Sequence, residues 1–211
     1  MKICTTKTRL TEEEALQLAS RDNSGLIGTF FNKLGHVPKE VSVLQIRKFY
    51  YPYYLEAAEA KLLRAAGLPT RRVVYTVAME GGFGTVQQME GRPATSYEEV
   101  DPSAVVVCKI DKAGADANVA KFIKRRAYKI FHQYPQVSTL EAYVVYKPHC
   151  ACLCQKGERR FFRILDAEIK DRNFMLDIKF RELTFMDKDA ANDRIDPALF
   201  FPENSPAADE L

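Results

Sequence analysis

An internal repeat constrains the fold of this chain more than any other feature of its sequence. When the chain is compared with itself at a shift of 96 residues, residues 33–52 match residues 129–148 at seven of 20 positions without a gap. The matched pairs are Lys33/Lys129, His36/His132, Val41/Val137, Ser42/Ser138, Leu44/Leu140, Tyr50/Tyr146 and Pro52/Pro148. Self-similarity at a fixed spacing is the signature of a repeated structural unit. The sequence therefore predicts two diverged copies of one unit, the second beginning near residue 104.

A core helix is predicted at the same place in each copy. Apolar residues recur there at the spacing that forms one face of an α-helix. They are Leu26, Ile27, Phe30, Phe31 and Leu34 in the first copy, and Val119, Phe122, Ile123, Ala127, Ile130 and Phe131 in the second. His36 and His132 follow these helices, where a basic side chain favours the negative end of the helix dipole. Their repetition is thus explained without catalysis.

Strands are expected on both sides of each core helix. The expected strands are residues 2–6, 43–55, 71–75 and 84–89 in the first copy, and residues 104–110, 139–153, 159–163 and 174–180 in the second. The long strand of each copy carries a proline, Pro52 or Pro148, which removes a donor from the ladder and indicates an edge or a bulge. Each copy is therefore predicted to run strand, helix, strand, strand, strand.

Two segments depart from this symmetry. Residues 11–19 predict an extra short helix in the first copy, because Thr11 followed by Glu14 is a capping-box pattern. Residues 56–66 have strong helix propensity, but the second copy has a strand-like sequence at the same place. We favour a strand there, since tertiary pairing overrides propensity.

The predicted fold class is α+β, with two tandem units in a pseudo-twofold arrangement and a helix covering the antiparallel sheet of each. The expected boundaries are residues 1–92 for the first unit, 93–103 for a linker, 104–195 for the second unit and 196–211 for a partly disordered tail, with both units in one compact domain. This order of elements is similar to that of tandem gyrase-inhibitor-like small-molecule-binding domains, which implies a central cleft and no catalysis. Repeated cystatin-like units are an alternative.

Charge and cysteine usage narrow the partners. The 31 basic and 28 acidic residues give a net charge of +3, and no window approaches 18 uncharged apolar residues. The balance argues against nucleic acid, although the pairs Arg71-Arg72, Arg125-Arg126 and Arg159-Arg160 lie near aromatic residues. No membrane span is expected. Five cysteines and no visible signal peptide indicate reduced thiols and a cytoplasmic protein.

A row of alternate cysteines is the first candidate site. His149, Cys150, Cys152 and Cys154 would place three thiols on one face of a strand. A structural zinc site usually needs a tight turn between its cysteines, which this spacing lacks. Cysteine is also a common core residue. We therefore interpret the row as packing and predict no metal and no cofactor, with a thiol- or metal-dependent enzyme as the alternative function.

A tyrosine cluster is the second candidate site. Tyrosine suits the wall of a binding pocket because it has an apolar body and a polar tip. Glu80 and Glu168 coincide at a shift of 88 residues near strand ends, where a carboxylate could bind a cationic group. The predicted ligand-binding residues are Tyr50, Tyr53, Tyr54, Glu80, Tyr146 and Glu168. Residues 81–84 contain three glycines, but a strand follows them, so they predict a hairpin turn instead of a phosphate loop.

The sequence thus predicts a non-catalytic protein that binds a small molecule or a peptide in the groove between its two units. No catalytic residue is assigned. A scaffold or a subunit of a protein complex is a further alternative, and a homodimer is left open as a partner.

Overall fold

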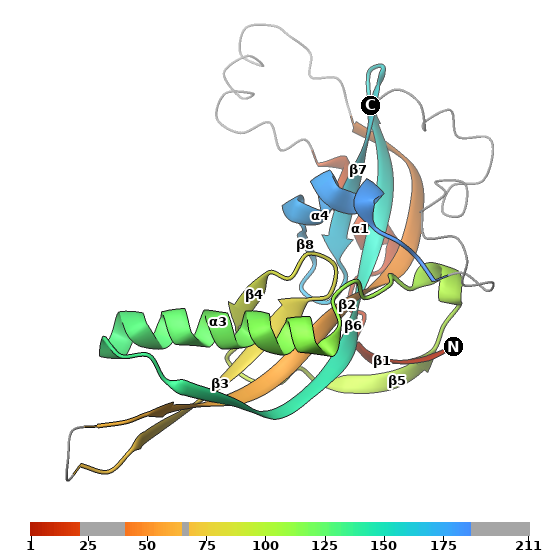
Figure 1. The fold of residues 1–211 in the computed structure, drawn as a ribbon. Helices are drawn as coiled ribbons and strands as arrows, with labels where there is room; N and C mark the ends of the chain where they lie inside the picture. Colours follow the sequence, from red (N-terminus) through yellow and green to blue (C-terminus); the bar gives the residue numbers. More distant parts are fainter. Residues whose placement is uncertain (22–40, 65–67, 187–211) are drawn as a thin grey trace, which may run out of the picture. The chain divides into compact units, whose positions relative to one another are not determined.

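The computed structural model describes residues 1–21, 41–64 and 68–186, and it has the α+β architecture that the sequence predicts (Figure 1). Its eight strands form one mixed sheet in the order β4-β3-β2-β6-β1-β5, with β7 pairing to β6 and β8 pairing to β7. The described residues also include three α-helices. The core helix expected at residues 26–34 and the tail expected at residues 196–211 lie outside the described residues.

The chain divides into two compact units that interleave along the sequence. The first unit comprises Met1–Lys7, Tyr51–Asp101 and Val106–Lys147. The second comprises the described residues of Thr8–Tyr50, Pro102–Val105 and Pro148–Leu211. Two long strands, β2 (Val41–Leu62) and β6 (Gln136–Lys156), therefore contribute one end to each unit. Each unit draws its residues from both predicted copies.

In the first unit, a long helix packs on an antiparallel hairpin. Strand β3 (Arg71–Glu80) pairs with residues 53–62 of β2, and β4 (Val86–Gln88) pairs with β3. Helix α3 (Lys112–Phe131) begins where the Asp111 side chain accepts a hydrogen bond from the Gly114 amide at 2.8 Å. Its buried face contacts the hairpin through Ala115, Val119, Ile123 and the strand residues Ala58, Ala60, Tyr75, Val77 and Met79. Burying apolar surface stabilises a fold by roughly 25 cal/mol per Å², so the burial of this face holds the helix on the sheet.

The same unit contains a second strand pair at the start of the chain. Strand β1 (Lys2–Thr6) pairs antiparallel with β5 (Thr95–Glu99) over five residue pairs. It also meets β6 in parallel, where Thr5 lies opposite Tyr146 and its hydroxyl donates to the Tyr146 carbonyl at 2.7 Å. The segment expected as a linker, residues 93–103, thus contains a strand.

In the second unit, helices pack on both faces of a hairpin. Strand β7 (Arg159–Asp166) pairs antiparallel with the end of β6, and β8 (Asp171–Arg172) pairs with β7. Helix α1 (Glu12–Ser20) covers the cysteine face of β6, and α4 (Phe174–Lys179) is tied to β7 by the Asp177 carboxylate, which accepts from the Ile164 amide at 2.5 Å. Two single turns of 3₁₀ helix, η1 (Pro102–Ala104) and η2 (Phe180–Glu182), complete the unit.

Several local predictions are confirmed. Thr11 caps α1 and Glu14 reaches back to the Thr11 amide at 3.0 Å, which is the capping box that the sequence predicts. Residues 56–62 are part of strand β2, as we expected from the repeat. Helix α3 ends at His132, whose φ of 53° is left-handed and whose amide donates to the Tyr128 carbonyl at 2.8 Å. Among the described residues, no helix is long and apolar enough to cross a membrane.

Three local predictions are wrong. Residues 174–180 form α4 and the start of η2 instead of a strand, because Asn173 caps the helix and Leu176 and Phe180 share a buried face. Residues 104–110 form no extended strand; Val105 and Val106 are isolated bridge residues, and Val105 pairs in parallel with Tyr50. Ile130 is 53% exposed, although the helical pattern predicts it in the core.

Candidate functional site

Three of the predicted ligand-binding residues lie together in the first unit. Tyr54 of β2 and Tyr146 of β6 lie beside Cys108, which precedes α3, and Glu80 at the end of β3 lies beside Tyr51 of β2. The buried Tyr51 lies beside Glu80 and Cys108 as well. We call these residues the Cys108 cluster: Tyr51, Tyr54, Glu80, Cys108 and Tyr146. Four separate segments of the chain supply it.

A glycine turn brings these segments within reach of one another. Strand β3 ends at Glu80, and the Gly81 amide donates to the Pro52 carbonyl at 2.9 Å. A Cβ atom on Gly81 would lie 2.6 Å from the Cys108 sulfur, and one on Gly82 would overlap the Tyr51 hydroxyl. Both positions thus require glycine because of close approach, and the turn serves the cluster and not a phosphate.

The residues before α3 are fixed by the same turn. The amides of Lys109 and Ile110 both donate to the Gly81 carbonyl, at 2.9 and 3.2 Å. The Cys108 thiol lies 3.7 Å from that carbonyl oxygen and 3.5 Å from the Ile110 carbonyl oxygen, distances typical of weak sulfur hydrogen bonds. The Tyr54 hydroxyl donates to the Ile110 carbonyl at 2.7 Å. The cluster is therefore held by backbone contacts that do not depend on a ligand.

The phenols of the cluster are neutral at physiological pH. Burial, followed by the neighbouring Cys108, raises the pKa of Tyr54 to about 12. Burial also raises the pKa of Tyr146, and burial together with the Glu80 charge raises that of Tyr51. Neutral phenols can both donate and accept hydrogen bonds. Tyr54, Cys108 and Tyr146 are each partly exposed, so their polar atoms are the reachable ones.

The other predicted ligand-binding residues lie elsewhere. Tyr53 faces the opposite side of the sheet, where it packs against the cluster of Leu55, Ala78 and Val145. Tyr50 belongs to the second unit, with the Lys48 ammonium 4.8 Å from its ring centroid. Glu168 also belongs to the second unit, and its amide donates to the Asp166 carboxylate at 3.0 Å. The structure thus brings Tyr54 and Tyr146 together at Cys108, with Glu80 beside the neighbouring Tyr51.

A small pocket lies on the Tyr53 side of the same sheet. Its lining includes Leu55, Ala57, Thr76, Arg92, Pro93 and Tyr143, and its interior volume is about 10 Å³. A single water needs about this much room. The pocket is too small for a drug-sized molecule.

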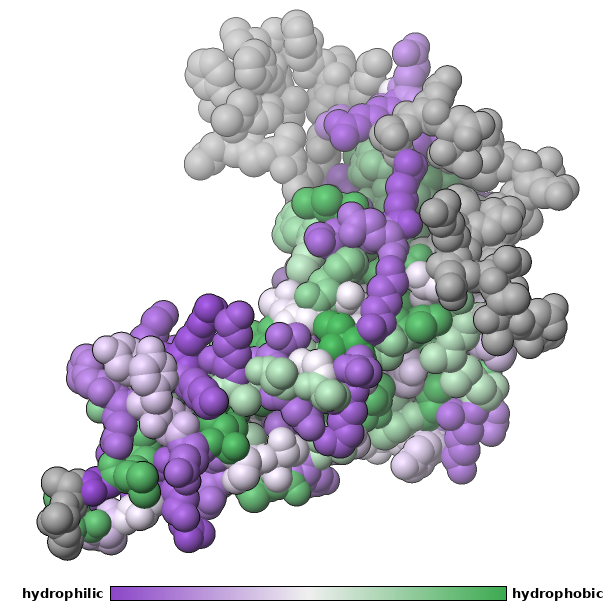
Figure 2. Space-filling view, viewed as in Figure 1, coloured by the Kyte–Doolittle hydropathy of each residue, from purple (hydrophilic) through white to green (hydrophobic). Residues whose placement is uncertain are grey.

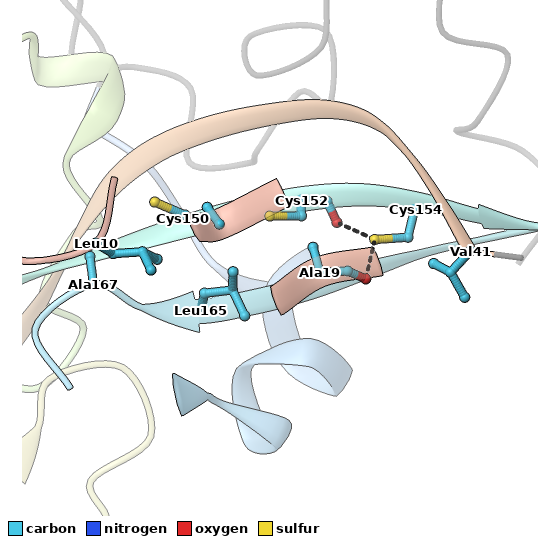
Figure 3. Close-up of a cluster of buried hydrophobic side chains, with 9 residues drawn as sticks. Leu10, Ala19, Val41, Cys150, Cys152, Cys154, Leu165 and Ala167 are labelled. Carbon is cyan, nitrogen blue, oxygen red and sulfur yellow. Dashed lines mark hydrogen bonds between the residues drawn. The ribbon is translucent and has the colours of Figure 1, made fainter. Parts of the chain in front are cut away.

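The cysteine row is a packed core element of the second unit. Cys150, Cys152 and Cys154 point from β6 toward the α1 side of the strand, among Leu10, Ala19, Val41 and Ala167 (Figure 3). All three are buried, and the Cys154 thiol lies 3.9 Å from the Ala19 carbonyl oxygen. Burial raises the pKa of Cys150 and of Cys154 to about 11, and it raises that of Cys152 as well. Thiols of this kind are poor nucleophiles, since the thiolate is the reactive form.

His149 does not join the thiols in a metal site. Its side chain is fully buried and stacks on Phe49, with ring centroids 5.4 Å apart. Successive residues of a strand face opposite sides, so His149 lies on the face away from Cys150. Within the described ranges, no group of three or more His, Cys, Asp or Glu residues could hold a metal ion.

Sequence reasoning missed Cys108 and Tyr51 as members of the site. At a shift of 104 residues, Cys108 matches Cys4 in the first copy, so the sequence assigns it to the repeated strand and not to a site. Tyr51 is one of four tyrosines in residues 50–54. The alternation of side chains along a strand does not show which of these tyrosines faces the glycine turn. A signal was present in Gly81-Gly82, because paired glycines often mark a close approach of other groups.

Comparison of the chain with protein families, with curated proteins and with solved structures finds no significant match in any of the three.

Proposed function

We propose that this protein is a non-catalytic binding protein and that it holds a small molecule or a peptide at the Cys108 cluster. The observation that carries the proposal is the convergence of two partly exposed neutral phenols and a thiol from three chain segments, with Tyr51 and Glu80 beside them. The groups are fixed by backbone hydrogen bonds such as those from Lys109 and Ile110 to Gly81. Preorganised polar groups lower the entropic cost of binding.

The cluster favours binding over catalysis. A nucleophilic cysteine needs a lowered pKa, which a neighbouring histidine, a cation or a helix N-terminus can supply. Cys108 instead lies beside Tyr51, Tyr54 and Tyr146 and contacts two carbonyl oxygens. The alternative enzyme based on Cys150, Cys152 and Cys154 is disfavoured by their burial and raised pKa values.

The internal duplication is part of this proposal, and hydrogen bonds support it. The Gly81 amide donates to the Pro52 carbonyl at 2.9 Å, and the Ala167 amide donates to the Pro148 carbonyl at 3.0 Å. The Gly81 carbonyl accepts from Lys109 and Ile110, while the Ala167 carbonyl accepts from Arg9 and Leu10. Each pair of donors directly precedes the N-cap residue of a helix, Asp111 in one case and Thr11 in the other.

The same parallel revises which acids correspond. Glu80 lies opposite Tyr53 on β2, and Asp166 lies opposite His149 on β6, in each case the residue after the proline. Four residues later the backbone is left-handed, at Gly84 with φ 75° and at Lys170 with φ 57°. Glu80 therefore corresponds to Asp166 at a spacing of 86 residues, and Glu168 is not its counterpart. The two copies differ at corresponding positions, such as Tyr54 in the first and Cys150 in the second. Such differences explain why only one unit would carry the binding site.

Alkylation of Cys108 tests the site. Compounds and short peptides would be screened by thermal shift and native mass spectrometry with the full chain carrying Cys4→Ser. Hits would then be tested for protection of Cys108 from N-ethylmaleimide, which the buried thiols resist. We expect Tyr54→Phe or Tyr146→Phe to weaken a hit by roughly tenfold, the value of one lost hydrogen bond.

Tyr97→Phe is the matched control, because this tyrosine of β5 is 72% exposed and its ring centroid lies 5.2 Å from the Lys2 ammonium. It should leave affinity unchanged. A hit that binds tightly without protecting Cys108, and that ignores Tyr54→Phe and Tyr146→Phe, would refute the site assignment.

A further inference from the structure

The second half of α3 concentrates positive charge that the whole-chain balance hides. Residues 117–140 contain no Asp or Glu, but they include five Lys and Arg side chains. These are Lys121, Lys124, Arg125, Arg126 and Lys129, and all five are exposed. The whole chain has a net charge of +3, so the remainder is net negative by two charges. Figure 2 shows hydrophilic side chains gathered over α3.

These five cations have no partners within the protein as described. None of them forms an ion pair or a hydrogen bond through its side chain with any residue in the described ranges. By contrast, the Lys112 ammonium near the start of the same helix lies 2.9 Å from the Asp116 carboxylate. Like charges spaced three or four residues apart along a helix repel one another by a few tenths of a kcal/mol. An external anion would relieve this repulsion.

An aromatic platform adjoins the basic face. Tyr128 and Tyr134 stack with ring centroids 4.6 Å apart and planes 17° apart, although they are 44% and 66% exposed. Tyr128 lies four residues after Lys124 and seven after Lys121, so the three side chains share one stripe of the helix. A planar ligand can extend such a stack without any rearrangement.

The hairpin end beside the helix continues the basic surface. The Gln133 amide donates to the Leu63 carbonyl at 2.5 Å, and the Arg71 guanidinium lies 4.4 Å from the Phe131 ring centroid. In the described residues 60–64 and 68–75 there are four cations, Lys61, Arg64, Arg71 and Arg72, and no acid. Within the part of the chain that the structure describes, only Arg72 of these four has a carboxylate within 4 Å, that of Glu59 at 3.6 Å.

We propose that this face of the first unit, defined by Lys121, Lys124, Arg125, Lys129 and the Tyr128–Tyr134 stack, binds single-stranded nucleic acid. Phosphates pair with the unpartnered cations, and an unpaired base stacks on the exposed tyrosine. This combination of a basic track with aromatic stacking is how proteins hold single strands without reading their sequence.

Other polyanions fit the face less well. Insertion into a membrane surface needs an apolar helix face, and α3 uses its own for the sheet through Val119, Ile123 and Ala127. A duplex offers phosphates but no free base for Tyr134. An acidic peptide satisfies the cations but leaves the stacked tyrosines unused.

Fluorescence anisotropy with labelled thymidine and uridine oligonucleotides tests the proposal on the full chain. With roughly five phosphate contacts, affinity should fall about 100-fold between about 50 and about 200 mM salt. The double variant Lys124→Glu/Arg125→Glu should lose at least about tenfold in affinity and show a shallower salt dependence. Tyr134→Ala should lose roughly tenfold with the salt dependence unchanged, and Tyr134→Phe should bind as the native chain does.

The variant Lys7→Glu/Arg9→Glu makes the same change in net charge at two exposed residues outside α3. It should retain most of the affinity. Equal losses in the two double variants would overturn the proposal, because total charge alone would then explain binding. Undetectable binding at low salt would overturn it too. So would equal binding to phosphatidylserine vesicles or to a blunt duplex that does not depend on Tyr134.

Discussion

Glu56 is the residue whose environment differs most from its sequence context. Its side chain is only 2% exposed, and one carboxylate oxygen accepts from the Thr139 hydroxyl at 2.7 Å. The other oxygen is buried without a hydrogen-bond partner among the described residues, and so is Oδ1 of Asp116. Burial raises the pKa of Glu56, the Thr139 hydrogen bond partly offsets this, and the Asp116 and Lys112 charges make smaller, opposing contributions. Nothing in the segment 56–66 signals this from sequence, because an exposed helical glutamate fits it equally well.

This environment predicts a dependence of stability on pH. The folded state keeps its Glu56 proton at pH values where the unfolded state has lost it. Protonation of Glu56 therefore contributes to the free energy of unfolding in full below the unfolded-state pKa of about 4.3. This contribution is lost as pH rises through the higher pKa of the folded state. Each unit of pKa difference is worth about 1.4 kcal/mol. We expect Glu56→Gln to flatten this decline and to raise the free energy of unfolding at pH 7 by about 1 kcal/mol.

Urea unfolding between pH 4 and pH 8 would measure this pH dependence of stability in the native chain and in Glu56→Gln. Glu59→Gln on the same strand is the control. Glu59 forms only a surface pair with Arg72, so its loss should change stability by less than about 1 kcal/mol. A native-like pH profile in Glu56→Gln would show that another group is responsible.

At the scale of elements, apolar periodicity identifies helix α3 but not where its contact with the sheet ends. Val119, Ile123 and Ala127 are buried as the pattern predicts, but Ile130 is exposed. Sequence periodicity specifies a face of the helix, whereas the extent of the partner hairpin decides how far that face is covered. Likewise α4 could not be distinguished from a strand over so few residues, because a short apolar run fits both periods.

A matched pair of substitutions on α3 tests this boundary. Ile123→Ala removes a fully buried side chain and should cost about 2–5 kcal/mol of unfolding free energy. Ile130→Ala makes the same chemical change about two turns away at an exposed position and should change stability by less than about 0.5 kcal/mol. Thermal and urea unfolding would distinguish them, and similar losses in both variants would contradict the observed burial.

The candidate site was predictable only in part, for a related reason. Tyr54, Glu80 and Tyr146 were identifiable because aromatic and acidic residues at strand positions suit a binding wall. Cys108 and the close approach of Gly81 depend on a contact between segments 27 residues apart in sequence. Sequence patterns specify faces of single elements and carry little information on such distant contacts.

For the whole molecule, the interleaved units predict that the two sequence halves cannot fold separately. The first unit needs both Tyr51–Asp101 and Val106–Lys147, and strand β2 neighbours β6 in the sheet. A fragment of residues 1–103 should therefore show narrow amide dispersion and no cooperative unfolding. Mixing it with residues 104–211 should restore both.

A full chain cleaved after folding, at a protease site inserted near residue 103, provides the control. Its two pieces should stay associated and keep the native spectrum. A well-dispersed spectrum from residues 1–103 alone would mean that the first predicted copy is an independent domain.

The division of β2 and β6 between two units also affects how the chain folds during synthesis. Neither unit is complete until β6, which ends at Lys156, has been made. The apolar residues near the middle of β2, such as Phe49 and Tyr51, therefore leave the ribosome about 100 residues before β6, which neighbours β2 in the sheet. At the ordinary synthesis rate of about 5–20 residues per second, that delay lasts at least several seconds. We predict that such a nascent chain is prone to aggregation during that interval, because long-range strand pairing leaves strand edges unpaired.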